Sequence, residues 1–118
     1  MAAINLEKAV RLMDGDQVLF DDLFAILESS LPEKFHNVEE AIEAASSVDL
    51  ELYAHQFKGA LRNVAAEEAC AVLDRLEKCG SRGDFAGARE LYPQVKPLVD
   101  QVLDFYRSRE WVSAFRPI

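Results

Sequence analysis

Apolar residues recur along most of this chain every three or four positions, which is the spacing of one face of an α-helix. The pattern is clearest from Gln17 to Ser46, where Pro32 interrupts it once. Its apolar positions are Phe20, Leu23, Phe24, Leu27, Leu31, Phe35, Val38, Ile42 and Ala45. Because proline removes a backbone donor and crowds the preceding turn, residues 17–46 are predicted to form one bent helix or two nearly coaxial ones.

Turn residues divide the neighbouring sequence into further helices. A short opening helix, capped by Asn5, ends at the Asp-Gly-Asp turn of residues 14–16. Its apolar positions are Ile4, Leu6, Val10 and Leu12. After the long segment, Asp49 is the predicted N-cap of a helix of about four turns that reaches Val64. Another helix is predicted over residues 66–79.

The run Gly-Ser-Arg-Gly-Asp at residues 80–84 provides a C-terminal glycine and then a new cap, and the last helix is predicted to follow it. Its apolar positions are Phe85, Leu91, Val95, Leu98, Val99, Val102, Leu103 and Tyr106. Pro93 and Pro97 lie in its first half and each disturbs the helical hydrogen-bond ladder. We therefore expect a kink, or a restart near Pro93.

Short connections between long amphipathic helices favour antiparallel neighbours. The sequence thus predicts an all-α fold, an antiparallel up-down-up-down four-helix bundle with a short extra N-terminal helix. The length of 118 residues fits one domain, with a core over about residues 10–108 and a C-terminal extension over residues 109–118. Trp111 and Phe115 in that extension are expected either to cap the bundle or to serve as an interaction handle.

Composition and charge narrow the function further. Thr is absent and Ala and Leu are abundant, which favours helix. The chain carries 13 Lys and Arg against 21 Asp and Glu, a formal net charge of −8. Such a protein repels a polyanion on average, so no nucleic-acid partner is expected. The apolar stripes are used up by the bundle, so we expect a monomer.

Two cysteines and the hydropathy of the chain bear on its location. Cys70 and Cys79 lie nine residues apart on one predicted helix, on opposite faces, so a disulfide between them is excluded and two thiols do not make a zinc site. No segment approaches the roughly 20 apolar residues of a membrane span, and no export signal is apparent. We expect a soluble cytoplasmic protein without a membrane partner, metal or cofactor.

The helix predicted after Asp49 separates a polar from an apolar face around His55. At about 100° per residue, the residues opposite His55 form the expected core face: Tyr53, Phe57, Ala60, Leu61 and Val64. Lys58, Gly59 and Arg62 fall on the same side as His55. The histidine is therefore predicted to point into solvent, with a cation one turn away, a glycine beside it and a second cation two turns on.

Each of these neighbours suits an imidazole that carries phosphate. A neutral imidazole nitrogen is nucleophilic near pH 7, and an ammonium such as Lys58 can stabilise the charge on a transferred phosphoryl group. Gly59 is unfavourable inside a helix and would leave clearance for a partner to approach. Taken singly, an exposed histidine, a surface lysine and a surface arginine are ordinary features. Their combination favours a functional site.

The run Ala54-His55-Gln56-Phe57-Lys58-Gly59-Ala60 resembles the signature of histidine-containing phosphotransfer (HPt) domains, in which Lys-Gly follows the histidine by three and four positions. The resemblance extends over roughly residues 10–108. It implies that His55 accepts a phosphoryl group on its distal ring nitrogen from one aspartate and donates it to another. It also implies that Lys58 stabilises the phosphoryl group and that Gly59 admits the loops of a receiver domain.

The resemblance also suggests secondary site residues and one departure. Gln56 and Arg62 would contribute to partner binding. Glu77, on the neighbouring helix, could approach His55 and orient the imidazole, although solvation at the surface is the expected state of its carboxylate. His36 has no Lys-Gly companion and is expected to be a plain surface residue. Ala65 stands where the family often has glycine, which puts the sharpness of that helix join in question.

The chain has no Gly-rich nucleotide loop and no kinase motif, so it should not phosphorylate itself. The predicted function is a phosphorelay carrier, not an enzyme, whose partners are receiver domains of response regulators or a hybrid histidine kinase. In the resemblance, the metal ion for the reaction belongs to the receiver domain. Two alternatives stay open: an HPt-shaped interaction module that regulates a signalling partner without carrying phosphate, and a plain helical scaffold.

Overall fold

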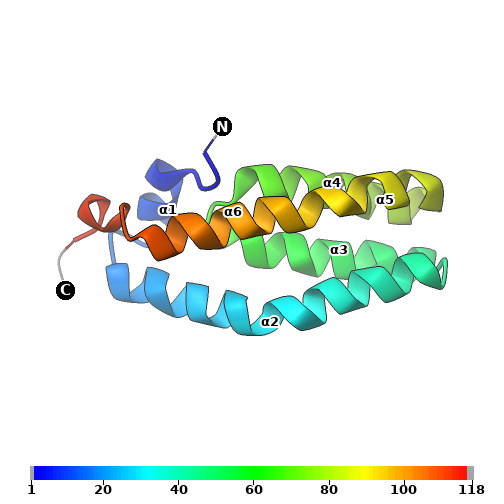
Figure 1. Cartoon of the computed structure of the whole chain (residues 1–118), viewed down its shortest axis with the longest axis horizontal. Helices are drawn as coiled ribbons and strands as arrows, with labels where there is room; N and C mark the ends of the chain where they lie inside the picture. The colour runs from blue at the N-terminus through cyan, green and yellow to red at the C-terminus, as the bar shows by residue number, and fades with distance from the viewer. Residues whose placement is uncertain (1, 117–118) are drawn as a thin grey trace.

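The computed structural model of the protein describes residues 2–116 and is helical throughout (Figure 1). The helices are α1 (Leu6–Leu12), α2 (Gln17–Glu43), α3 (Ser47–Arg62), α4 (Glu67–Arg82), α5 (Phe85–Leu91) and α6 (Val95–Ser108). Two single-turn 3-10 helices, η1 (Tyr92–Gln94) and η2 (Val112–Ala114), follow α5 and α6. The predicted all-α fold class is confirmed.

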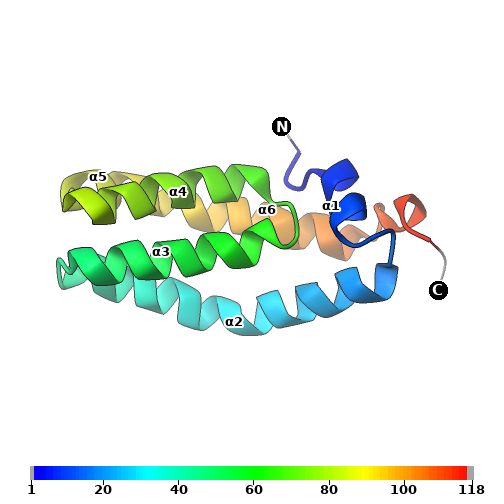
Figure 2. The ribbon, with the colours of Figure 1, turned by 180° about the vertical axis from the view of Figure 1, so that it is seen from behind.

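The long helices form an antiparallel bundle in the up-down-up-down order that the sequence predicts. Figure 2 shows α3 between α2 and α4, and Figure 1 shows α6 returning along the opposite side. α2 is a single bent helix that contains Pro32, which confirms the first of the two predicted alternatives for this segment. α5, η1 and α6 together form the fourth arm, which restarts at η1, next to Pro93, as predicted.

Most of the predicted helix ends agree with the structure. The side chain of Asn5 accepts a hydrogen bond from the Lys8 N–H and caps α1. Gly83 adopts a left-handed conformation, with φ of 69°, immediately after α4. Two of the predicted ends are wrong. α4 does not stop at residue 79 but continues through Gly80 to Arg82. Ser46 and not Asp49 caps α3: the Ser46 side chain accepts from the backbone N–H of Asp49. Asp49 therefore lies in the first turn, where its carboxylate interacts favourably with the helix dipole and stabilises the helix.

The join between α3 and α4 is sharp although Ala65 stands where the resemblance leads us to expect glycine. Ala65 has a φ of 59°, a left-handed conformation that costs a non-glycine residue about 1–2 kcal/mol. Its carbonyl accepts a hydrogen bond from the Asn5 N–H at 2.9 Å. The N-terminal segment thus ties down the strained turn.

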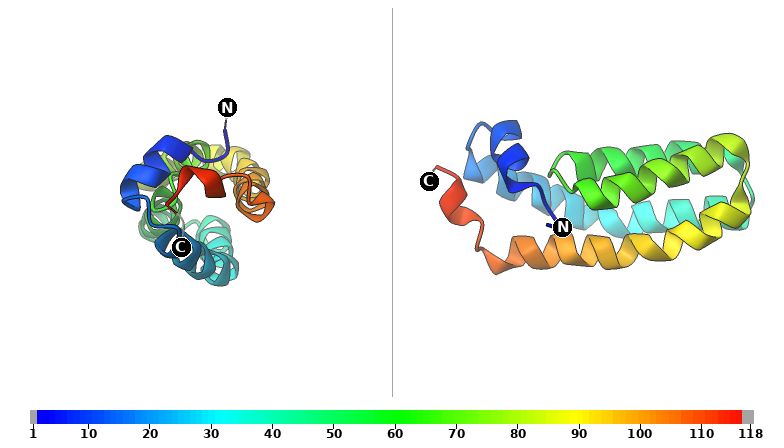
Figure 3. Two further views of the ribbon diagram at one scale, coloured as in Figure 1. Left: turned by 90° about the vertical axis from the view of Figure 1, so that its left-hand side faces the viewer. Right: turned by 90° about the horizontal axis from the view of Figure 1, so that it is seen from above.

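The C-terminal extension caps the end of the bundle where α2 projects past α3 and α4 (Figure 3). Trp111 is 1% exposed and packs edge-on against Phe20, with ring centroids 4.8 Å apart. Its indole N–H donates to the Tyr106 carbonyl at 2.8 Å, and Phe115 packs on Phe20 from another side. Of the two predicted roles of the extension, the described part fits the cap; residues 117–118 lie outside the described residues.

The positions of α3 and α4 are fixed at one end by a very close contact. A Cβ atom on Gly80 of α4 would lie 2.5 Å from the backbone nitrogen of Glu51 on α3. Next to it, the Ser47 hydroxyl donates to the Gly80 carbonyl. Only glycine lets the two backbones approach this closely, so Gly80 sets the separation of the helices that carry the site described below.

We expect Gly80→Ala to lower the free energy of unfolding by about 1–3 kcal/mol, because the new methyl group meets backbone and not a flexible side chain. Urea denaturation followed by circular dichroism measures the change. Gly59→Ala is the matched control: a Cβ there has no atom within 4 Å, and alanine should stabilise the helix by up to about 1 kcal/mol. Equal effects at both positions would show that the helix contact is not tight.

Candidate functional site

His55 lies on the face of α3 that points away from the core, as its helical position predicts. Its side chain is 61% exposed. On the opposite face of α3, Phe57, Leu61 and Val64 are fully buried, while Tyr53 and Ala60 are partly buried against the core. The predicted core face of this helix is therefore correct, and the imidazole is accessible to another protein.

Glu77 of α4 contacts the histidine directly. Its Oε1 lies 3.1 Å from His55 Nδ1, and the carboxylate is only 25% exposed. The expectation that this carboxylate is simply solvated is wrong, because the close packing of α4 on α3 turns it toward the imidazole. A carboxylate that is ionised can only accept a hydrogen bond. For the neutral ring we therefore assign the proton to Nδ1, which leaves a lone pair on Nε2, the ring nitrogen distal to the backbone.

Lys58 does not project into solvent beside His55, so the helical-wheel placement on the exposed side is wrong. Its side chain is 10% exposed and lies in the interface with α4. Nζ lies 3.0 Å from Asp74 Oδ1 and 2.8 Å from Glu77 Oε1. His55 and Lys58 therefore share one oxygen, Oε1 of Glu77, which lies 3.1 Å from His55 Nδ1 and 2.8 Å from Lys58 Nζ. The imidazole and the ammonium are thus close neighbours.

The cluster of charges continues outward along α4. Lys78 Nζ lies 2.9 Å from Asp74 Oδ2, so each oxygen of Asp74 contacts a different ammonium. The side chains of Asp74 and Lys78 are 41% and 61% exposed. Two cations and two carboxylates thus form a continuous row, which we call the charge row: Lys58, Glu77, Asp74 and Lys78.

These contacts hold the charge row in its ionised form. Contacts with Glu77 and Asp74 raise the pKa of Lys58 above its usual value. Partial burial by itself raises the pKa of Glu77, but hydrogen bonds with Lys58 and His55 outweigh it and the pKa lies below the usual value. The pKa of Asp74 is likewise lowered, by Lys78 first and then by Lys58. Near pH 7 Lys58, Glu77 and Asp74 therefore carry their charges.

The surface next to His55 is open and partly apolar. A Cβ on Gly59 would meet no atom within 4 Å. Val48 and Leu52 precede His55 by two turns and one turn on α3, and they are 77% and 46% exposed. Beside them, a groove between α2 and α3 is lined by Leu23, Ile26, Leu27, Ser30, Lys34, Gln56, Ala60 and Asn63. Ile26 in this groove is 63% exposed.

In the described part of the chain, the side chains of the remaining candidate residues form no hydrogen bond or ion pair with His55 or with the side chains of the charge row. Gln56 and Arg62 are exposed on α3, and no contact joins either to the charge row. His36 is exposed on α2 and pairs with Glu40 at 3.3 Å, in agreement with its prediction as a surface residue. Cys70 and Cys79 are free thiols. Between residues 2 and 116, no group of three or more potential ligands could hold a metal ion.

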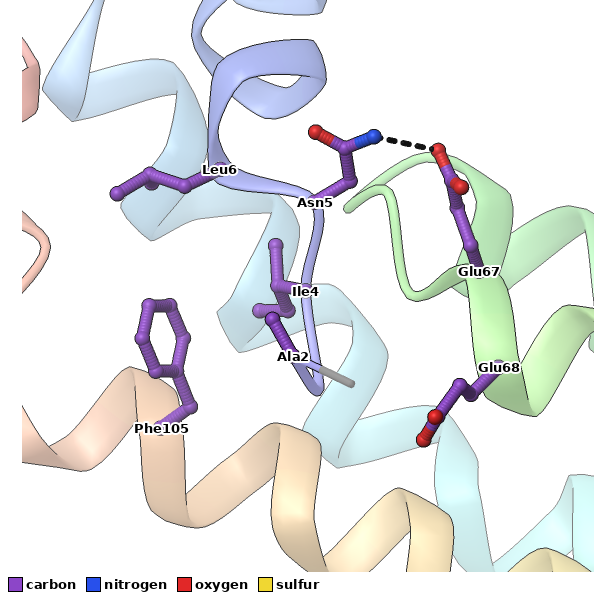
Figure 4. A pocket seen from close by; sticks show the side chains of 7 residues that line it. All are labelled: Ala2, Ile4, Asn5, Leu6, Glu67, Glu68 and Phe105. Atoms are coloured by element: carbon purple, nitrogen blue, oxygen red, sulfur yellow. Dashed lines mark hydrogen bonds between the residues drawn. The ribbon is translucent and has the colours of Figure 1, made fainter.

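A further hollow of the bundle lies apart from the candidate site residues. Figure 4 shows a hollow between the N-terminal segment, the start of α1, α4 and α6, which is lined by Ala2, Ile4, Asn5, Leu6, Glu67, Glu68 and Phe105. None of the candidate site residues lines it. Among the helices in residues 2–116, none combines the length and the hydropathy that crossing a bilayer requires.

Comparison with known proteins agrees with the resemblance in the sequence. The family model described as Hpt domain matches residues 22–105, which include α3, α4 and most of α6. The chain belongs to the HPt domain family. HPt domains are histidine phosphotransfer modules of two-component signalling that carry a phosphoryl group, are not enzymes in their own right, and interact with receiver domains. Searches of curated proteins and of solved structures gave no match.

Sequence reasoning did not single out Asp74 and Lys78, although a signal for their pairing was available. They are four residues apart on one helix, the spacing at which opposite charges meet. Nothing in the sequence, however, indicates that Asp74 also reaches Lys58, which is 16 residues earlier in the chain. That contact depends on the packing of two helices.

The bond to Glu77 predicts an unusual protonation of His55. We expect the neutral ring to carry its proton on Nδ1, and Glu77→Ala to move the population toward the Nε2–H form, because the acceptor is lost. Nitrogen chemical shifts of the imidazole measure both forms. His36, whose Nε2 faces Glu40, serves as the internal reference in the same spectrum. A predominant Nε2–H form of His55 in the unmodified protein would contradict the assignment.

Proposed function

We propose that this protein is a phosphorelay carrier in which His55 accepts a phosphoryl group from an aspartate of one receiver domain and passes it to another. The observation that carries the proposal is the contact between His55 Nδ1 and Glu77 on an exposed helix face. That contact leaves the lone pair of Nε2 directed away from the bundle. No other exposed histidine in residues 2–116 has such an arrangement, since His36 meets its carboxylate through Nε2.

The transfer follows from this geometry. The lone pair of Nε2 attacks the phosphorus of the aspartyl phosphate, the N–P bond forms, and the P–O bond to the aspartate breaks, so that the carboxylate leaves with the electron pair. No proton has to leave Nε2, because the ring proton is on Nδ1. The ring gains positive charge as the N–P bond forms, and the ionised Glu77 stabilises it. Donation to the second receiver is the reverse reaction.

The ammonium of Lys58 would stabilise the transferred phosphoryl group in the same reaction. Its ammonium has three donors, two of which face Asp74 and Glu77. In the part of the chain that the structure describes, no other acceptor takes the third. This donor is available to an oxygen of the phosphoryl group, which brings about −1.5 to −2 charges to the histidine.

The receiver domain would dock on the surface around His55. Gly59 gives its loops access, and the exposed side chains of Val48, Leu52 and Ile26 provide apolar contact. Gln56 and Arg62 would contribute polar contacts at the edge. A surface of this kind suits a transient complex at the small end of specific interfaces.

We also infer that residues 1–118 act as one domain, because a single hydrophobic core includes residues from Ile4 to Phe115. The two free cysteines support a cytoplasmic location, where thiols stay reduced. The burial of the apolar helix faces within this core supports a monomer. Autokinase activity is not expected, since the chain lacks nucleotide-binding motifs.

Mixing the protein with a radiolabelled phosphorylated receiver domain should move label onto it, in an acid-labile and alkali-stable form. We expect His55→Gln to abolish uptake completely with an unchanged circular dichroism spectrum, because the nucleophile is removed from an exposed position. His36→Gln is the matched control and should behave as the unmodified protein. Label that persists on His55→Gln would disprove the site, and receiver binding without any transfer would favour the interaction module.

Gly59→Ala should slow phosphoryl transfer by roughly tenfold while it leaves the fold intact or stabilises it. The methyl group fills space that is empty in this chain and that the receiver domain would occupy. Stopped-flow transfer kinetics and urea denaturation on the same variant measure the two effects. A transfer rate equal to that of the unmodified protein would show that clearance at this position is not needed.

A further inference from the structure

Asp74 takes no part in the phosphoryl transfer described above, but it contacts Lys58, the lysine that would stabilise the phosphoryl group. Oδ1 lies 3.0 Å from Lys58 Nζ and Oδ2 lies 2.9 Å from Lys78 Nζ. Its carboxylate is half-exposed and is not needed to satisfy a buried partner other than Lys58. Such an arrangement divides Asp74 between a site lysine and a surface lysine.

We propose that Asp74 and Lys78 are positioning residues that set the phosphoryl-transfer equilibrium of His55 by acting on Lys58. This proposal rests on the phosphorelay function proposed above. Asp74 competes with the phosphoryl group for the ammonium of Lys58 and so weakens the stabilisation of phosphohistidine. Lys78 neutralises Asp74 and weakens that competition.

The geometry favours a competition between Asp74 and the phosphoryl group for Lys58 over a role of Asp74 in simply holding Lys58 in place. A phosphoryl group on Nε2 would lie on the side of the ring away from Glu77, whereas Asp74 holds Lys58 from the α4 side. The third donor of Lys58 would come closer to the phosphoryl oxygens if Nζ moved toward them, and that movement would lengthen its contact with one carboxylate. Glu77 is bound to both His55 and Lys58, so Asp74 is the partner that Lys58 can release. Lys78 is already in contact with Asp74 and keeps the released carboxylate paired.

The two residues should therefore shift the equilibrium in opposite directions. With a receiver domain at fixed concentration, Asp74→Asn should raise the ratio of phosphohistidine to aspartyl phosphate by roughly two- to fivefold, the range expected for a partly exposed ion pair. Lys78→Gln should lower the ratio by a similar factor. Partition of radiolabel between the two proteins at equilibrium gives the ratio.

Two controls separate action through Lys58 from other effects. Asp100→Asn removes the same charge from a similar exposed pair, Lys96–Asp100 on α6, and should leave the ratio unchanged. In a Lys58→Met background, Asp74→Asn should no longer raise the ratio, because there is no ammonium to compete for. A direct repulsion between Asp74 and the phosphoryl group would instead persist in that background.

The outcomes distinguish this inference from the proposed function. If the unmodified protein accepts label on His55 but Asp74→Asn leaves the ratio unchanged or lowers it, the role of Asp74 is overturned and the carrier function stands. A shift of equal size in Asp100→Asn, or an undiminished shift without Lys58, overturns it as well. If the unmodified protein accepts no label, the proposed function itself fails. Thermal denaturation of each variant identifies any shift caused by unfolding.

Discussion

The close packing of α3 against α4 determines the chemistry available at His55, because the histidine and the carboxylate that binds it come from different helices. Gly80 permits this packing, and the Ser47 hydroxyl bridges the two helices beside it. A hydrogen bond weakens steeply when its distance or angle departs from the optimum. A small shift of α4 would therefore separate Glu77 from the imidazole while leaving the bundle intact.

Lys58 lies in the same interface, and its buried ammonium needs partners of opposite charge. An ammonium removed from water is destabilising unless it is paired, and here Asp74 and Glu77 both pair with it. With Lys78 the charge row sums to zero, so the site is not a basic patch. In a chain of net charge −8, such a neutral row offers a partner little long-range attraction. In the docking proposed above, short-range contact with the apolar residues Val48 and Leu52 would therefore carry more of the recognition.

Periodicity predicts the bundle well because core positions depend on spacing along one helix. It places Phe57 and Leu61 in the core and His55 outside, and the structure agrees. The same reasoning fails for Lys58, which lies at the border of the polar face, where the neighbouring helix decides whether a side chain is covered. The N-cap of α3 is predicted wrongly for another reason. Ser46 and Asp49 are three positions apart and both are residue types that cap helices, so the pattern alone does not choose between them.

The sharing of Lys58 explains how one imidazole could both accept and donate a phosphoryl group. A carrier that bound the group with full cationic stabilisation would hold it too firmly to release it, since only a difference between the two states drives transfer onward. A carrier with no cation would disfavour acceptance, because Glu77 faces the added negative charge. In the proposed carrier, an ammonium that remains bound to carboxylates would give partial stabilisation. That intermediate strength would keep the free energies of donor and acceptor states close, which is the condition for a reversible relay.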